Sequence, residues 1–124
     1  MIGELGGPMG LVAAPAGSVY LTEAFSGQVS KIDAGGQKTV IAKDLKMPEG
    51  VALAADGKLI VAEVGAKRIV EIDPATGSVT EIAGNLPIGL PGNPNIPTGV
   101  GVGASGTIYF SSDVENTIYK ITKK

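Results

Sequence analysis

The stretch PEGVALAADGKLIVAEVGAKRIVEID at residues 48–73 decides the fold of this chain, because related stretches occur before and after it. Each of the three copies begins with a Pro-x-Gly triplet, at residues 8–10, 48–50 and 97–99. A second glycine follows each triplet at a fixed distance, at Gly17, Gly57 and Gly106. The copies align without a gap over about 25 positions, and repetition at roughly 40 to 50 residues indicates a solenoid or a propeller.

The second copy predicts four short strands, at residues 50–54, 58–64, 68–73 and 78–83. Asp-Gly at residues 56–57 favours a tight hairpin after the first strand, and DPATG at residues 73–77 favours a turn after the third. The second strand is apolar at consecutive positions, which indicates burial on both faces. Four antiparallel strands covered on both faces by similar neighbours form a propeller blade. The chain is therefore predicted to be an all-β propeller with three four-stranded antiparallel blades.

The two ends of the chain are out of phase with the repeat. The first two copies carry a fourth strand ending in a similar phrase, IAKDL at residues 41–45 and IAGNL at residues 82–86, whereas the third copy has none. Residues 1–5 stand at the matching place before the first triplet, so an N-terminal strand would complete the last blade. We expect one domain over residues 1–124: an outer-strand stub at 1–5, blade 1 at 8–47, blade 2 with a long link at 48–96, and blade 3 without its outer strand at 97–124.

The composition excludes several classes of function. None of the 124 residues is cysteine or histidine, so disulfides, thiolate zinc sites and imidazole acid–base catalysis are excluded. The net charge of −2, with dispersed lysines, offers no basic patch for nucleic acid. No positive region precedes the mildly apolar N-terminus, and no apolar run approaches the ~20 residues of a membrane span. We expect a soluble chain with no signal peptide and no membrane partner, and its compartment stays open.

The repeated sequence segments resemble those of NHL-repeat proteins and, more broadly, those of the six-bladed propellers of the gluconolactonase/regucalcin (senescence marker protein) family. The segments that carry this likeness are PEGVAL at residues 48–53, DGKLIVAE at 56–63 and RIVEID at 68–73. Similar segments occur in the third copy at residues 97–102 and 106–111. The likeness covers nearly the whole chain and is specific for the type of blade. It implies that the three blades are half of a six-bladed ring.

Three blades alone leave two blade faces bare, because propellers close with about four to eight blades. Bare apolar faces mark an association surface. We predict a homodimer with two-fold symmetry that closes one six-bladed ring, in which residues 1–5 of each copy lie beside the third blade of the other. A second interpretation, compatible with the first, is that the chain is a fragment of a longer propeller protein.

Candidate ligand-binding residues gather where the loops of a propeller meet its central channel. The candidates on that face are Glu23, Glu49, Glu63, Asn93, Asn95, Asp113 and Asn116. Glu23 and Glu63 end two second strands, and the plain expectation for them is a polar strand end that faces solvent. The two asparagines at 93 and 95 belong to a long link at residues 87–96, which is either functional, as long loops in compact repeats often are, or a flexible spacer. A small molecule at the channel is the ligand that this arrangement predicts.

The family resemblance also implies a divalent cation at the channel mouth, held by a glutamate, an asparagine and an aspartate, and the hydrolysis of lactones. By position only Glu49, in its Pro-Glu-Gly setting, is similar to the family's glutamate ligand. Asn93, Asn95, Asp113 and Asn116 are candidates for the remaining oxygens, and no motif chooses among them. Carboxylate and amide oxygens suit Ca²⁺ or Mg²⁺.

Three functions stay open on the sequence alone. The chain is a self-assembling half propeller that binds a small molecule or a protein without catalysis, or a metal-dependent lactonase, or a fragment with no independent function. No catalytic residue is assigned, because the sequence contains no recognisable catalytic motif. Whether the chain is an enzyme therefore stays undecided.

Overall fold

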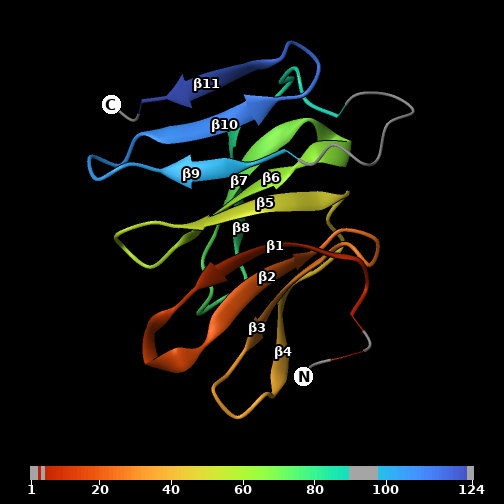
Figure 1. Ribbon diagram of the computed structural model, residues 1–124, viewed down its shortest axis with the longest axis vertical. Coiled ribbons are helices and arrows are strands. Elements are labelled where there is room, and N and C mark those ends of the chain that lie inside the picture. Colours follow the sequence, from red (N-terminus) through yellow and green to blue (C-terminus); the bar gives the residue numbers. More distant parts are fainter. Residues whose placement is uncertain (1–2, 4, 90–97, 123–124) are drawn as a thin grey trace.

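The computed structural model describes residues 3, 5–89 and 98–122, and these residues form three antiparallel sheets (Figure 1). In the first two sheets the strands follow one another in chain order, each bonded to the next. The third sheet has the same meander with one strand fewer. The predicted all-β fold, with blades of antiparallel strands, is confirmed.

The strands are short and regularly spaced along the chain. The first sheet contains β1 (Pro8–Ala13), β2 (Val19–Glu23), β3 (Gln28–Ile32) and β4 (Lys38–Ala42). The second contains β5 (Pro48–Leu53), β6 (Leu59–Glu63), β7 (Arg68–Ile72) and β8 (Val79–Ala83). The third contains β9 (Val100–Val102), β10 (Ile108–Ser112) and β11 (Thr117–Ile121). Single 3-10 turns occur at η1 (Pro15–Gly17) and η2 (Val64–Ala66).

The first strand of each sheet lies on the inside of the stack. β5 contacts β1 on one side and β9 on the other, so the three sheets succeed one another around these inner strands (Figure 1). This is how the blades of a propeller surround its channel. The ends of the inner strands therefore determine which residues meet at the channel.

The predicted outer-strand stub is only partly described. Gly3 and Leu5 belong to no strand, and Met1, Ile2 and Glu4 lie outside the described residues. The sheets that hold β1 and β11 lie at opposite ends of the stack (Figure 1). Completion of the third blade by residues 1–5 of another copy therefore stays a prediction.

The repeated second glycines take the turn role that the sequence predicts. Gly17, Gly57 and Gly106 all have positive φ, at 75°, 88° and 86°, a conformation that is costly for residues with a Cβ. In the second copy the hairpin closes when Ala54 donates its N–H to the carbonyl of Lys58 at 2.9 Å. The predicted hairpin between the first two strands of this blade is confirmed.

Two apolar clusters fill the spaces between the sheets. The first joins sheets one and two and includes Tyr20, Val29, Val51, Leu59 and Val61. The second joins sheets two and three and includes Ile60, Ala62, Ile69, Ile108 and Phe110. Successive residues of β6 alternate between the two clusters, because neighbouring side chains of a strand point to opposite faces. The predicted burial of this strand on both faces is confirmed.

The glycine of the Pro-x-Gly triplet lets successive inner strands approach closely. A Cβ on Gly50 would overlap the carbonyl oxygen of Thr98 and would lie 2.8 Å from the backbone nitrogen of Val100. A Cβ on Gly10 would overlap the carbonyl oxygen of Glu49 in the same way. The repeat located these glycines in the sequence, and the structure shows that they serve the contact between blades.

Replacement of Gly50 by alanine should destabilise the fold by about 1 to 3 kcal/mol, because the backbones of β5 and the segment before β9 must move apart. Urea unfolding of the purified chain measures this change. Gly101→Ala is the matched control, since nothing lies within 4 Å of a Cβ there and Ala52 holds the same position in β5. Equal losses for the two variants would contradict the close approach.

Candidate functional site

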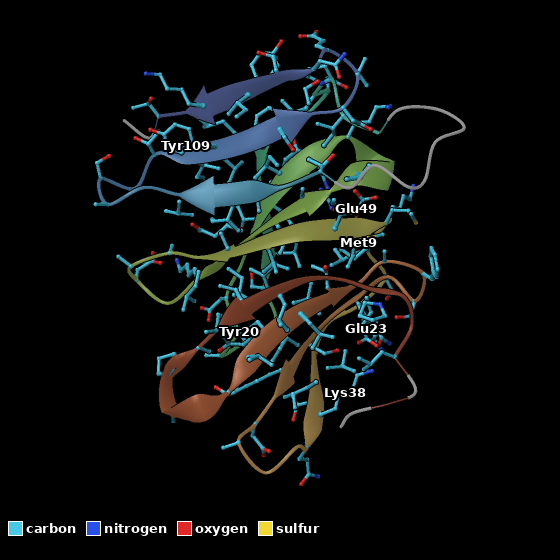
Figure 2. The ribbon with its side chains drawn as sticks, in the orientation of Figure 1. Met9, Tyr20, Glu23, Lys38, Glu49 and Tyr109 are labelled. Atoms are coloured by element: carbon cyan, nitrogen blue, oxygen red, sulfur yellow. The ribbon has the colours of Figure 1, made fainter. Side chains whose placement is uncertain are left out.

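The beginnings of the inner strands and the ends of the second strands lie along one edge of the stack. Figure 2 shows Met9, Glu49 and Glu23 toward this edge, on the right of the view. At the inner strands the surface is hollowed to a volume of about 450 Å³, and its wall includes Met9, Glu49, Thr98 and Ser111. The first residues of β1, the first residues of β5 and the segment that leads into β9 form most of this hollow.

Glu49 is the acid in the wall of the hollow. Its side chain is buried, and Oε1 accepts the backbone N–H of Thr98 at 2.8 Å. Burial raises the pKa of Glu49, the hydrogen bond from Thr98 acts in the opposite direction, and the negative charge of Asp113 raises the pKa further. Glu49 thus connects the second blade to the third and places a carboxyl group in the wall of the hollow.

Thr98 and Asp113 bring further oxygen atoms to the neighbourhood of Glu49. The Thr98 hydroxyl is buried and has no hydrogen-bond partner among the described residues. Asp113 lies after β10, and its Oδ1 accepts the N–H of Gly89 at 2.9 Å. Because buried polar atoms are nearly always paired, the unpaired hydroxyl is a candidate contact for a bound molecule.

The expectation that Glu23 faces solvent is wrong. Its side chain is fully buried at the end of β2. Oε1 accepts the N–H of Gly6 at 3.0 Å and bonds Lys38 Nζ at 2.7 Å, while Oε2 accepts the Ser30 hydroxyl at 2.6 Å. Burial opposes the charge of Glu23, but the bonds from Lys38, Ser30 and Gly6 prevail and lower its pKa.

The same expectation is wrong for Glu63, which is also buried. Its Oε2 accepts the N–H of Lys46 at 2.9 Å, and its Oε1 pairs with Arg68 Nε at 2.6 Å. Glu63 therefore does for the second blade what Glu23 does for the first. Each acid holds the segment that leads into the inner strand of its own blade, and each is balanced by a basic side chain.

The third copy uses a serine in place of these glutamates. Ser112 ends β10, donates its hydroxyl to the carbonyl of Pro87 and accepts the N–H of Glu115 at 3.0 Å. The pattern that could have revealed this role in the sequence is a polar residue at the end of every second strand. The backbone partners before the inner strands, Gly6, Lys46 and Pro87, lie 17 to 25 residues away from these side chains, and the sequence pattern does not specify them.

The remaining candidates have different positions. Asn116 has a φ of 53° in the turn between β10 and β11, where Lys67 and Gly27 also have positive φ in the other two blades. Asparagine tolerates this left-handed conformation better than most residues, which gives the side chain a turn role. Asn93 and Asn95 lie outside the described residues. Within residues 3, 5–89 and 98–122, no group of three or more His, Cys, Asp or Glu side chains could hold a metal ion.

No protein-family model matches this chain, and no curated protein sequence matches it. Solved structures do match. A virginiamycin B lyase from Staphylococcus aureus with bound quinupristin superposes with a TM-score of 0.72 at 23% identity, over 94% of this chain and 38% of that chain. A gluconolactonase from Xanthomonas campestris superposes with a TM-score of 0.77 at 17% identity, over 96% of this chain and 45% of that chain. A chain in a nidogen/laminin complex superposes with a TM-score of 0.71 at 20% identity, over 91% of this chain and 42% of that chain.

These matches define the class of protein. The chain is a partial β-propeller, and it spans less than half the length of the solved chains that it matches. More particularly, its blades have the gluconolactonase-like fold, as the repeated sequence segments indicated. At these identities the likeness shows the fold alone. Among the described residues, no helix is long and apolar enough to cross a membrane.

Replacement of Glu23 by glutamine should destabilise the fold by about 1 to 3 kcal/mol at pH 7, because Lys38 loses the charge that it pairs with. The lowered pKa of Glu23 stabilises the native state above the ordinary glutamate pKa, and this contribution is lost as the pH falls through the lowered value. In urea unfolding, the gap between wild type and Glu23→Gln should therefore narrow as the pH falls below the ordinary glutamate pKa of about 4.3. A gap that does not narrow at any acidic pH at which the wild type is still folded would contradict this assignment.

Proposed function

We propose that this chain is a self-assembling half propeller that pairs with a second copy to close a six-bladed ring, whose channel then binds a small polar molecule. The proposal rests on one observation. Apolar positions that are buried between blades inside the chain are exposed on its two terminal blades. The partial propeller fold and its likeness to longer propellers support the same arrangement.

The outward face of the first blade carries Leu11. This residue is 69% exposed, whereas Val51, at the matching position of the second blade, is 9% exposed. Val51 is covered because it packs into the apolar cluster between the first two sheets. Leu11 lacks such a cover within the described chain, so its face is the first half of an open interface between blades.

The outward face of the third blade carries Tyr109 and Ile118. Tyr109 is 43% exposed and its counterpart Ile60 is 1% exposed, while Ile118 is 73% exposed and its counterpart Ile69 is 0% exposed. Ile60 and Ile69 are covered by the third blade itself. The face with Tyr109 and Ile118 is therefore the second half of the same kind of interface.

A second copy of the chain fits both open faces at once. With two-fold symmetry, the third blade of each copy packs against the first blade of the other, and six blades close the ring. Each open face is then covered by a face equivalent to the one that covers its counterpart inside the chain. Further blades of a longer polypeptide are the alternative cover, and the oligomeric state distinguishes the two arrangements.

Sedimentation analysis of the purified chain should give a mass of about twice 12.4 kDa. Ile118→Lys should weaken the dimer about tenfold or more, because a charge enters the apolar contact. Val79→Lys is the control, since Val79 is exposed on the outer strand of the middle blade. A folded monomer of 12.4 kDa in the wild-type protein would rule out the proposed assembly.

A metal-dependent lactonase is the second candidate, and Glu49 favours it. This buried acid at the channel matches the family's glutamate ligand by position, with the unpaired Thr98 hydroxyl and Asp113 near it. Such oxygens suit Ca²⁺, but its shell of about six to eight oxygens needs more donors than these residues supply. The described residues fit one side of a cation site and do not complete it.

Calorimetric titration with Ca²⁺ and with Mg²⁺ tests this second candidate. If a cation binds, wild type should release or absorb heat, and Glu49→Gln should lose most of that signal because a neutral amide replaces the charged donor. Glu81→Gln is the control, because Glu81 is an exposed acid on the outer strand β8, where it pairs with Arg68 away from the hollow. An absence of heat in wild type would remove the metal-dependent hydrolase.

A further inference from the structure

Where two neighbouring blades pack together, their interface forms a seam. The seam between the first two blades contains a polar bridge beside Gly10, the glycine of the first Pro-x-Gly triplet. The Thr22 hydroxyl accepts the N–H of Gly10 at 2.8 Å and donates its own proton to the carbonyl oxygen of Glu49. That carbonyl lies directly over Gly10, where a Cβ would overlap it. One hydroxyl therefore joins an inner strand of one blade to the carbonyl of the next.

The third blade has the same bridge with its last partner missing from the described chain. The Ser111 hydroxyl accepts the N–H of Gly99 at 2.9 Å, as Thr22 does for Gly10. Among the described residues no hydrogen bond is made by the Ser111 hydroxyl proton. The space over Gly99 is open, since the nearest atom to a Cβ there is the Ser111 hydroxyl oxygen at 3.7 Å.

The middle blade shows that two neighbouring blades can pack together without this hydroxyl bridge. Ala62 holds the position of Thr22 and Ser111 in β6, so it supplies no hydroxyl. The seam between the second and third blades is instead joined by Glu49 Oε1, which accepts the N–H of Thr98 at 2.8 Å. The Ser111 hydroxyl is therefore not repeated in every blade, and it is a specific feature of the outward face of the third blade.

We propose that Ser111 and Gly99 are the receiving site for residues 8–10 of a second copy, an inference that rests on the proposed ring. Met9 of the partner subunit matches Glu49 by position in the Pro-x-Gly triplet. Its carbonyl oxygen passes over Gly99 and accepts the hydrogen bond of the Ser111 hydroxyl. This reproduces the contact of Glu49 with Gly10 and Thr22.

The apolar surroundings fit the same occupant. A hollow of about 200 Å³ lies beside this site, with Gly101, Tyr109 and Ile118 in its wall. In the first seam, Val51 packs in one cluster with Tyr20 and Val29, which match Tyr109 and Ile118 by position. Leu11 of the partner subunit matches Val51, so its side chain fills this hollow.

Gly99→Ala tests the site because it should affect only the assembled ring. Its Cβ has room in the single chain, but in the ring it would overlap the incoming carbonyl, as a Cβ on Gly10 overlaps that of Glu49. Sedimentation over a dilution series should show a weaker dimer, with a dissociation constant roughly tenfold higher or more. Circular dichroism should show unchanged secondary structure. Gly35→Ala, in the exposed turn between β3 and β4 and away from the hollow, is the control and should keep the wild-type dissociation constant.

Two serine variants test the hydrogen bond separately. Ser111→Ala should weaken the dimer by about fivefold, the effect of one lost hydrogen bond, and Ser111→Thr should restore it because threonine fills this role at Thr22. If wild type dimerises and Gly99→Ala and Ser111→Ala dimerise equally well, the receiving site is wrong while the ring stands. If wild type is a folded monomer, the proposed ring itself fails.

Discussion

The close approach of successive inner strands is the constraint on which the rest of this structure depends. Gly10 and Gly50 each leave room for the carbonyl oxygen of the next blade, and any side chain there would force the strands apart. At that short spacing the strands behind them, such as β6, bury both faces against neighbours. Small polar groups beside the glycines then reach the next backbone, as the Thr22 hydroxyl does.

The buried glutamates of the described chain are of two kinds. Glu23 and Glu63 are buried with basic partners, Lys38 and Arg68, and they hold the segments that enter the inner strands. Glu49 instead bonds a backbone N–H and has the negative Asp113 nearby, so its pKa is raised. A buried acid that has no basic partner among the described residues and lies in the wall of a hollow is the more reactive kind and the better candidate for ligand contact.

The sequence predicted the blades because their signals are local. Turn glycines such as Gly57 and the apolar run of β6 report on neighbouring residues, so the observed strands of the second blade differ from the predicted ones by no more than two residues. The burial of Glu23 was missed because its partners, Gly6 and Lys38, are distant in the chain. The contact of Gly50 with Thr98 was missed for the same reason, and Glu49 was found by its place in a repeated triplet.

The position of Glu49 also has a consequence for the number of ligands that the proposed ring can hold. A channel on a two-fold axis presents two identical Glu49 carboxyl groups, one from each copy. An asymmetric molecule at its centre would meet both in either of two equivalent orientations, and its presence would exclude a second molecule. The expected stoichiometry at such a central position is therefore one ligand for every two chains.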